Sequence, residues 1–459
     1  MSDIRNKNLI LFITTLAAFL TPFMASAINI SLPAIGIEFG MNAVLLSWVV
    51  TAYMLAAAMA LVPFGRIADI YGRKKVFLIG IIVFTIASLW AALSNSTFIL
   101  IFSRVLQGIG GAMTFGTGTA ILISAYPFNE RGKILGINIG AVYLGLSLGP
   151  FLGGILTQYF GWRSIFLVNV PLGLIVLILT LWKLKSEWVE CKDEKLDFAG
   201  SIVYGLTLLF IMYGLSILPK LFGFVFIVFG IAGILLLINR ESRVVHPILN
   251  INLFRKNITF AFSNLAAAIN YSATSAVGFL LSLYLQNIKD LNPKDAGLVL
   301  VSQPIVMAVF SPLAGRLSDK IEPRITASIG MALTFIGLLL FVPINANTSM
   351  GFIIFNLLLL GLGFALFSSP NTNAVMSSID KKFYGVASGT LATMRMIGQM
   401  FSMGIAMLIF SVIMGRVKIS PEYYGVFLKS IGVAFSIFAV LCFGGIFASL
   451  ARGKLRNTQ

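Results

Sequence analysis

The sequence predicts an all-α protein that crosses a membrane many times. Hydrophobic residues make up 58% of the 459 residues and mean hydropathy is +0.97. Only 11% of residues are charged, whereas soluble domains carry about 25%. All 16 Asp and Glu residues fall in connecting loops or at the ends of the long apolar stretches, whereas Arg104 and Arg395 lie inside them. Since ionisable residues inside spanning helices usually mark function, this pattern indicates a membrane-embedded transporter.

Fourteen apolar stretches are long enough to span a bilayer, which requires about 20 residues each. We place them at 9–32, 46–64, 76–95, 98–125, 134–157, 164–182, 197–215, 221–239, 258–286, 296–313, 326–345, 351–377, 386–414 and 427–450. Only Pro219 and Lys220 separate the seventh from the eighth. The first stretch is too long for a signal peptide and no cleavage site followed by a soluble domain is present, so we expect it to remain as a span.

The distribution of basic residues predicts the orientation. With fourteen spans, 24 of the 33 Lys and Arg residues lie in loops on the side of the termini and 7 on the other. This bias predicts cytoplasmic termini in a multi-pass plasma-membrane protein. A twelve-span alternative without 197–239 gives nearly the same asymmetry. The net charge of +17 is then explained by loops beside anionic lipid, and we expect no nucleic-acid partner.

Catalytic and metal chemistry find little support in the residue types present. Cys191 is predicted in a loop and Cys442 in the last span, so they should not pair. The only histidine, His246, falls in a loop, and no metal-ligand spacing occurs. We therefore predict neither an enzyme nor a cofactor or metal site.

A repeated loop divides the chain into two similar parts. Residues 65–75 read GRIADIYGRKK and residues 315–324 read GRLSDKIEPR, each between the second and third spans of a six-span set. Such repetition is typical of transporters built from duplicated halves. Glycine permits close approach, and an Asp can cap a helix or pair with Arg. We predict a conformational latch formed by Gly65, Asp69, Gly72, Arg73, Gly315 and Asp319. The alternative is a pair of short turns that carry topological charges.

These motifs resemble those of the major facilitator superfamily. The loop residues Gly65, Asp69, Gly72, Arg73 and Lys74 match its signature, and Gly315, Arg316 and Asp319 match a weaker copy. In the fourth span, Arg104, Gln107 and Gly108 match a motif around an intramembrane arginine. The fifth span is similar to the antiporter motif of drug exporters, with Gly136, Gly145, Gly149, Pro150, Gly153 and Gly154 at the same spacing. Small residues allow tight helix contact, and proline bends a helix.

The fourteen-helix drug:proton antiporter branch is the most similar. The segment 162–173 looks like its entry to helix 6, and 283–286, 370–371 and 395–399 also resemble its signatures. The resemblance implies a major facilitator fold of two six-helix bundles, at 1–190 and 251–459, with two linker helices in 191–250. It also implies a central cavity that opens alternately to each side.

The first span departs from that branch. Many members carry an Asp where this chain has Met24. Since a buried Asp, Glu or His usually carries the proton in a pump, coupling would require Asp69, Glu38 or another acid at a helix end, or a different ion.

Polar uncharged residues and the two arginines remain as cavity candidates. Gln107 is three residues after Arg104 and Gln399 four after Arg395, so each shares its arginine's helix face. Asn264, Tyr271 and Ser275 should form one stripe. Our candidates for the cavity or for coupling are Arg104, Gln107, Asn29, Asn138, Asn264, Tyr271, Arg395 and Gln399. Interhelical hydrogen bonds explain an isolated Asn equally well.

Three functions remain open. The first is secondary active export of drugs or other amphipathic compounds by a monomer, with protons as the coupling ion. The second is export of lipids or anionic metabolites, which cavity arginines would attract. The third is a membrane receptor or interaction protein without transport, which the retained motifs of moving helices disfavour.

Overall fold

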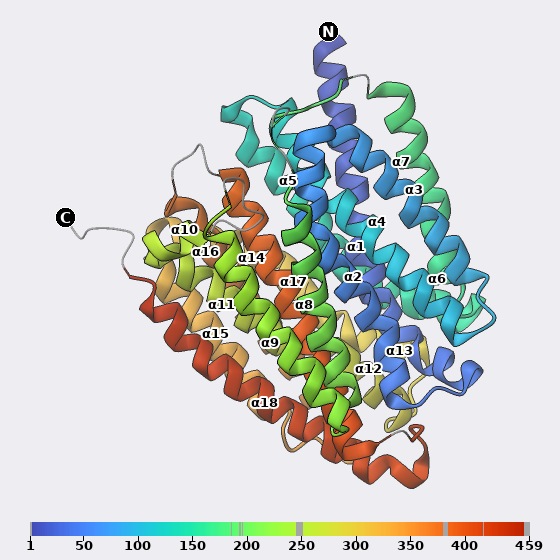
Figure 1. Cartoon of the computed structure of the whole chain (residues 1–459). Helices are drawn as coiled ribbons and strands as arrows, with labels where there is room; N and C mark the ends of the chain where they lie inside the picture. Colours follow the sequence, from blue (N-terminus) through green and yellow to red (C-terminus); the bar gives the residue numbers. More distant parts are fainter. Residues whose placement is uncertain are drawn as a thin grey trace.

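The computed structural model describes residues 2–184, 186–191, 194, 196–244, 251–379, 384–415 and 417–453. The regular elements of these residues are helices, and they include 14 segments long and apolar enough to cross a membrane. The predicted fourteen spans are therefore confirmed, and the seventh and eighth are separate helices (Figure 1).

Capping residues mark the start of several helices in the first six spans. Ser96 and Asn42 cap helices by accepting hydrogen bonds from the backbone three residues later. The sixth span consists of two helices joined at Val168. The helices are α1 (Ser2–Phe39), α2 (Ala43–Tyr71), α3 (Arg73–Ala92), α4 (Thr97–Ala125), α5 (Phe128–Phe160), α6 (Ser164–Leu167) and α7 (Asn169–Lys183).

The two middle spans, α8 (Phe198–Ile217) and α9 (Leu221–Glu241), form a hairpin. Asp197 closes its base, because its carboxylate caps the backbone N–H of Gly200 at 2.9 Å and accepts two hydrogen bonds from Arg240 at 2.7 and 3.1 Å. The Arg240 guanidinium holds the pKa of Asp197 below its usual value. The Tyr204 hydroxyl donates to the carbonyl of Ala58 on α2 at 2.9 Å, which anchors the hairpin to the first six spans.

The last six spans contain more broken helices. The ninth span is interrupted at Ser275 and the tenth at Val301. The helices are α10 (Ile251–Lys256), α11 (Ile258–Thr274), α12 (Val277–Asn287), α13 (Pro293–Leu300), α14 (Ser302–Lys320), α15 (Pro323–Leu340), α16 (Met350–Ser377), α17 (Tyr384–Ile409), the π-helical turn η2 (Phe410–Met414), the 3₁₀ turn η3 (Pro421–Tyr423) and α18 (Tyr424–Ala451).

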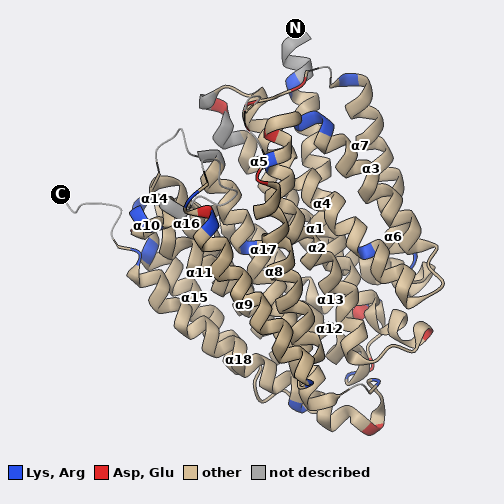
Figure 2. Cartoon of the chain, in the orientation of Figure 1, with Lys and Arg blue, Asp and Glu red and all other residues tan. Residues whose placement is uncertain are grey.

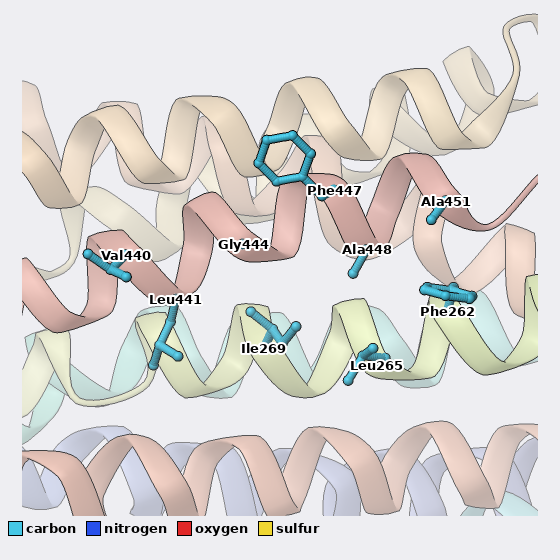
Figure 3. Close-up of a pocket in the computed structure, with 9 residues that line it drawn as sticks. All are labelled: Phe262, Leu265, Ile269, Val440, Leu441, Gly444, Phe447, Ala448 and Ala451. Atoms are coloured by element: carbon cyan, nitrogen blue, oxygen red, sulfur yellow. The ribbon is translucent and has the colours of Figure 1, made fainter.

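The outer surface suits a lipid environment. Charged residues gather at the two ends of the helices, and the middle of the molecule is almost uncharged (Figure 2). An apolar groove of about 430 Å³ runs along the outside between α11 and α18 (Figure 3). Its lining contains no charged residue, and Val440 and Phe447 there are largely exposed. We assign this groove to the lipid-facing surface.

Several hydrogen bonds between the two sets of six spans lie towards one side of the membrane. We call the side where α1 begins and α18 ends the terminal side, and the opposite one the far side. Towards the far side, Ser282 and Gln286 of α12 donate to the carbonyls of Asn29 and Ile30 on α1, at 2.5 and 2.9 Å. Beyond the ends of these helices, the backbone of Ala43 donates to Val417 at 3.2 Å.

Candidate functional site

Arg104 lies inside the first six spans. Its side chain is fully buried, its Nε donates to the carbonyl of Val49 at 2.9 Å and one Nη to Gln107 at 2.5 Å. The guanidinium carbon lies 4.4 Å from the centre of the Tyr53 ring. Gln107, which shares the face of Arg104 as predicted, donates onward to Ser88 at 2.8 Å. These contacts join α2, α3 and α4, so the geometry of Arg104 favours a structural role over a place in a cavity.

Arg395 occupies a different environment. It lies on α17, which packs against α11 and α16 and also against α2 of the first six spans. One Nη donates to the Thr372 hydroxyl at 2.5 Å, and the guanidinium carbon lies 5.7 Å from the Tyr271 ring centre. Among the described side chains, the buried Nε of Arg395 has no hydrogen-bond partner and the guanidinium has no carboxylate within salt-bridge distance.

Aromatic and hydroxyl side chains surround this arginine. Tyr271 meets Phe364 edge to face, with ring centres 5.2 Å apart. The Tyr143 hydroxyl of α5 lies 3.5 Å from the Ser368 hydroxyl of α16, a contact between the first and the last six spans. We call Tyr143, Tyr271, Ser368, Thr372 and Arg395 the arginine–tyrosine cluster.

The amide candidates do not join this cluster as one stripe. Asn264 is fully buried and donates to its own helix at Phe260, while Ser275 falls where α11 ends. Asn29 lies beside α12, because a Cβ atom added at Gly278 would lie 3.6 Å from the Asn29 amide nitrogen. The Asn138 amide nitrogen is buried without a partner among the described residues. Gln399 and Arg395, both within the described residues, are not joined by a hydrogen bond.

Met24 is enclosed in the first six spans. It is fully buried, and the Asn169 amide donates to its sulfur at 3.3 Å and to the Ile165 carbonyl at 2.8 Å. The position of Met24 is therefore neutral and is occupied by a thioether beside an amide.

The first signature loop forms a larger ion-pair network than predicted. Asp69 and Arg73 are joined at 2.8–2.9 Å, and Arg73 also contacts Glu190 at 2.7 Å and the Ser124 hydroxyl at 2.5 Å. Gly72 has φ of 120°, a conformation that favours glycine. At Gly65, by contrast, an added Cβ would meet nothing within 4 Å. Glu190 was not among the predicted latch residues, although three glutamates in 187–194 after the sixth span were a visible signal.

The second copy of the loop is only partly described. An added Cβ at Gly315 would lie 2.8 Å from the Ser369 hydroxyl, and the side chain of Asp319 lies outside the described residues. The prediction missed a buried cation nearby, Arg452. Arg452 is fully buried and donates to Asn371 at 2.9 Å and to the carbonyl of Ser449 at 2.8 Å. Burial lowers the pKa of Arg452 to about 10.

The glycines of the fifth span face three directions. Added Cβ atoms at Gly145, Gly149 and Gly153 would collide with α1. At Gly154 the added atom would lie 2.5 Å from the carbonyl oxygen of Pro293 on α13, whereas at Gly136 it would meet nothing within 4 Å. Pro150 lies inside α5 and its carbonyl faces Gly297 of α13. One helix therefore packs within its own set and also against the opposite one.

Comparison with known proteins gives a consistent result. The family model described as the Major Facilitator Superfamily matches residues 14–240 and 263–456. The riboflavin transporter RibZ of Clostridioides difficile (strain 630) is 32% identical over 408 residues, covering 88% of this chain and 87% of its own. The multidrug resistance protein Stp of Mycobacterium tuberculosis (strain CDC 1551 / Oshkosh) is 30% identical over 411 residues, covering 88% and 75%.

A solved structure shares the fold. The crystal structure of the peptide transporter POT in complex with sulfate superposes with a TM-score of 0.70 at 13% identity, covering 95% of this chain and 94% of that one. At this identity the similarity concerns the arrangement of helices.

Proposed function

Because this chain belongs to the Major Facilitator Superfamily, we propose that it is a secondary active transporter that exports drugs or other small amphipathic compounds by alternating access. Its membership and its transporter relatives identify a membrane transporter of small molecules, not an enzyme. Drug export and its coupling to protons are the proposal, supported by the antiporter-type glycines of α5 and by relatives named as drug resistance proteins.

Contact between the two sets of spans towards the far side is the observation that carries the proposal. Hydrogen bonds join α1 to α12, and Gly154 and Gly297 let α5 and α13 touch through their backbones. At Gly154 and Gly297 no side chain separates the backbones of the two helices. Such an interface suits two bodies that rock against one another, and we interpret this conformation as closed towards the far side.

The organisation of the chain follows from the same proposal. We assign 1–190 and 251–459 to the two moving bundles and 191–250 to the linker helices. We also propose that the terminal side is cytoplasmic, that the protein lies in the plasma membrane and that it acts as a monomer. On this orientation the far side, where these contacts lie, is the extracellular side.

Proton coupling would depend on acids at helix ends. Glu38 at the far side accepts hydrogen bonds from Trp162 at 2.7 Å and from Arg163 at 2.6 and 2.9 Å. Asp69 at the terminal side pairs with Arg73. Protonation of either carboxylate would weaken an ion pair on one side of the membrane, which offers a physical route from proton gradient to conformation.

A second candidate cargo is a neutral or anionic metabolite. The specific observation that favours it is Arg395, a half-buried cation with no carboxylate beside it among the described residues. A relative named as a riboflavin transporter is consistent with a neutral aromatic cargo. Retained transport motifs leave the non-transporting receptor without support.

Inverted vesicles that carry the protein provide the test. An imposed pH gradient should drive ethidium movement, and ethidium addition should release lumenal protons. Vesicles with Asp69→Asn protein should show less of both. Movement of ethidium that ignores the gradient would refute proton coupling, and movement of neither ethidium nor riboflavin by correctly inserted protein would refute the transport proposal.

A further inference from the structure

We propose that the arginine–tyrosine cluster binds planar aromatic solutes that present an anionic or carbonyl edge, and that it favours them over cations of the same ring system. This inference rests on the proposed transport function and specifies the substrate class. It assigns the guanidinium of Arg395 to the acceptor edge of the solute and the rings of Tyr143 and Tyr271 to its faces.

The positive charge of Arg395 is not neutralised by a carboxylate in the surrounding helices. The helices α11, α16 and α17 contain no Asp or Glu in their sequences, and the acid of α2, which also packs against α17, is Asp69 in its ion pair with Arg73. Among the described residues, the interactions found for the guanidinium are the hydrogen bond to the Thr372 hydroxyl and the contact with the Tyr271 ring. A cation in a medium of low dielectric constant strongly attracts an anion or an oriented carbonyl.

The hydrogen-bonding capacity of Arg395 is the second step. A guanidinium carries five N–H groups in a planar fork that matches a carboxylate or a carbonyl edge. One Nη is used by Thr372, and the buried Nε has no partner among the described residues. Buried donors are normally satisfied, so a ligand acceptor would complete this site.

The rings give the third step. Tyr271 is held edge-on by Phe364, and Tyr143 approaches from the other set of spans to within 3.5 Å of Ser368. Tyrosine rings from opposite bundles supply flat faces against which an aromatic solute can stack. A solute between them would contact both bundles, so its binding energy would depend on the conformation of the transporter.

Arg104 shows why the two arginines differ. Arg104 also has one buried Nη without a partner among the described residues, but it is enclosed within one set of spans by the Val49 carbonyl, Gln107 and the ring of Tyr53. A solute could reach it only by separating packed helices. Arg395 is half-buried and lies on a helix that also packs against α2 of the opposite set.

Two dyes with the same tricyclic ring system and opposite charges test the inference. The purified full-length protein is reconstituted into liposomes, and uptake and binding of anionic fluorescein and cationic rhodamine 123 are measured. We expect saturable fluorescein transport that rhodamine 123 competes for poorly. Arg395→Gln should raise the KM for fluorescein about tenfold or more, because a charge-assisted hydrogen bond is lost. Arg395→Lys should recover part of this loss.

The control removes the same charge elsewhere. Arg243 lies in an exposed loop after α9, so Arg243→Gln should leave the KM for fluorescein unchanged. Preferred transport of rhodamine 123, or an Arg395→Gln variant with wild-type KM for fluorescein, would overturn the inference while transport itself stood. Fluorescein binding that depends on Arg395 without movement across the membrane would support the inference and contradict the proposed function.

Discussion

Gly154→Ala should weaken the contact that closes the far side. The added methyl carbon would lie 2.5 Å from the carbonyl oxygen of Pro293 and 3.1 Å from Cα of Lys294. Both atoms belong to the backbone of α13 and cannot rotate away. Gly297 of α13 lies on the other surface of the same contact, since a Cβ atom added at Gly297 would lie 3.4 Å from Cα of Gly154.

The size of the effect follows from these distances. Carbon and carbonyl oxygen normally approach to about 3.3–3.6 Å, so α5 and α13 must separate by roughly 1 Å at this point. Overpacking of this kind costs about 1–3 kcal/mol. Since about 1.4 kcal/mol is a factor of ten, the equilibrium constant for closure at the far side should fall by about 5- to 150-fold. The clash arises between the two sets of spans, so each bundle should remain folded.

Double electron–electron resonance between spin labels at the far side measures this shift. Leu93→Cys at the end of α3 and Asn347→Cys before α16 place one label on each bundle at exposed positions. The background replaces the native Cys191 and Cys442. We expect Gly154→Ala to move the distance distribution towards longer separations and to reduce the transport rate.

Gly136→Ala is the matched control, because it lies on the same helix and its added methyl meets nothing within 4 Å. Any gain in helix propensity applies to both variants. Equal distance distributions in the wild type and Gly154→Ala would refute the reasoning. A Gly136→Ala variant that shifted as much as Gly154→Ala would show that the glycine contact is not the cause.

Three further predictions concern buried or paired charges. Arg104→Met should destabilise the protein by about 2–3 kcal/mol, because Gln107 and the Val49 carbonyl lose a charged donor. Thermal unfolding measures this loss of stability, and an unchanged Tm would contradict the structural role of Arg104. Asp69→Asn should slow transport severalfold without reducing membrane insertion, since Arg73 keeps Glu190; wild-type rates would remove the latch. Arg240 lowers the pKa of Asp197 from its usual value of 3.8. The ion pair therefore stabilises the fold above pH 3.8, and this contribution is lost as the pH falls through the pKa of the folded state. Asp197→Asn should make the Tm fall less steeply with acid than in the wild type, and equal declines of Tm would refute this prediction.

Hydropathy was sufficient to predict the fourteen spans, because the length and polarity of a span are properties of one continuous segment. The pair Asp69–Arg73 was also predictable, since residues four apart share a helix face. The partners of Glu190 and Arg452 were not predictable. Each reaches its partners through the folding of segments far apart in the sequence, such as Arg452 with Asn371.

The two intramembrane arginines show the same limit more clearly. In sequence Arg104 and Arg395 are similar, since each lies in an apolar helix with a glutamine three or four residues later. Packing separates them: Arg104 donates to Gln107 inside one bundle, while Arg395 donates to Thr372 between helices that border the other. Only the three-dimensional arrangement decides which arginine a solute can reach.

Solute counterflow in proteoliposomes tests alternating access most directly. Liposomes that contain the purified protein are loaded with unlabelled fluorescein or ethidium and diluted into a trace of the labelled compound without any ion gradient. The account predicts a transient accumulation of label above equilibrium, because a carrier that faces one side at a time exchanges solutes. Label that only approaches equilibrium, with either compound and with protein shown to be folded, would contradict it.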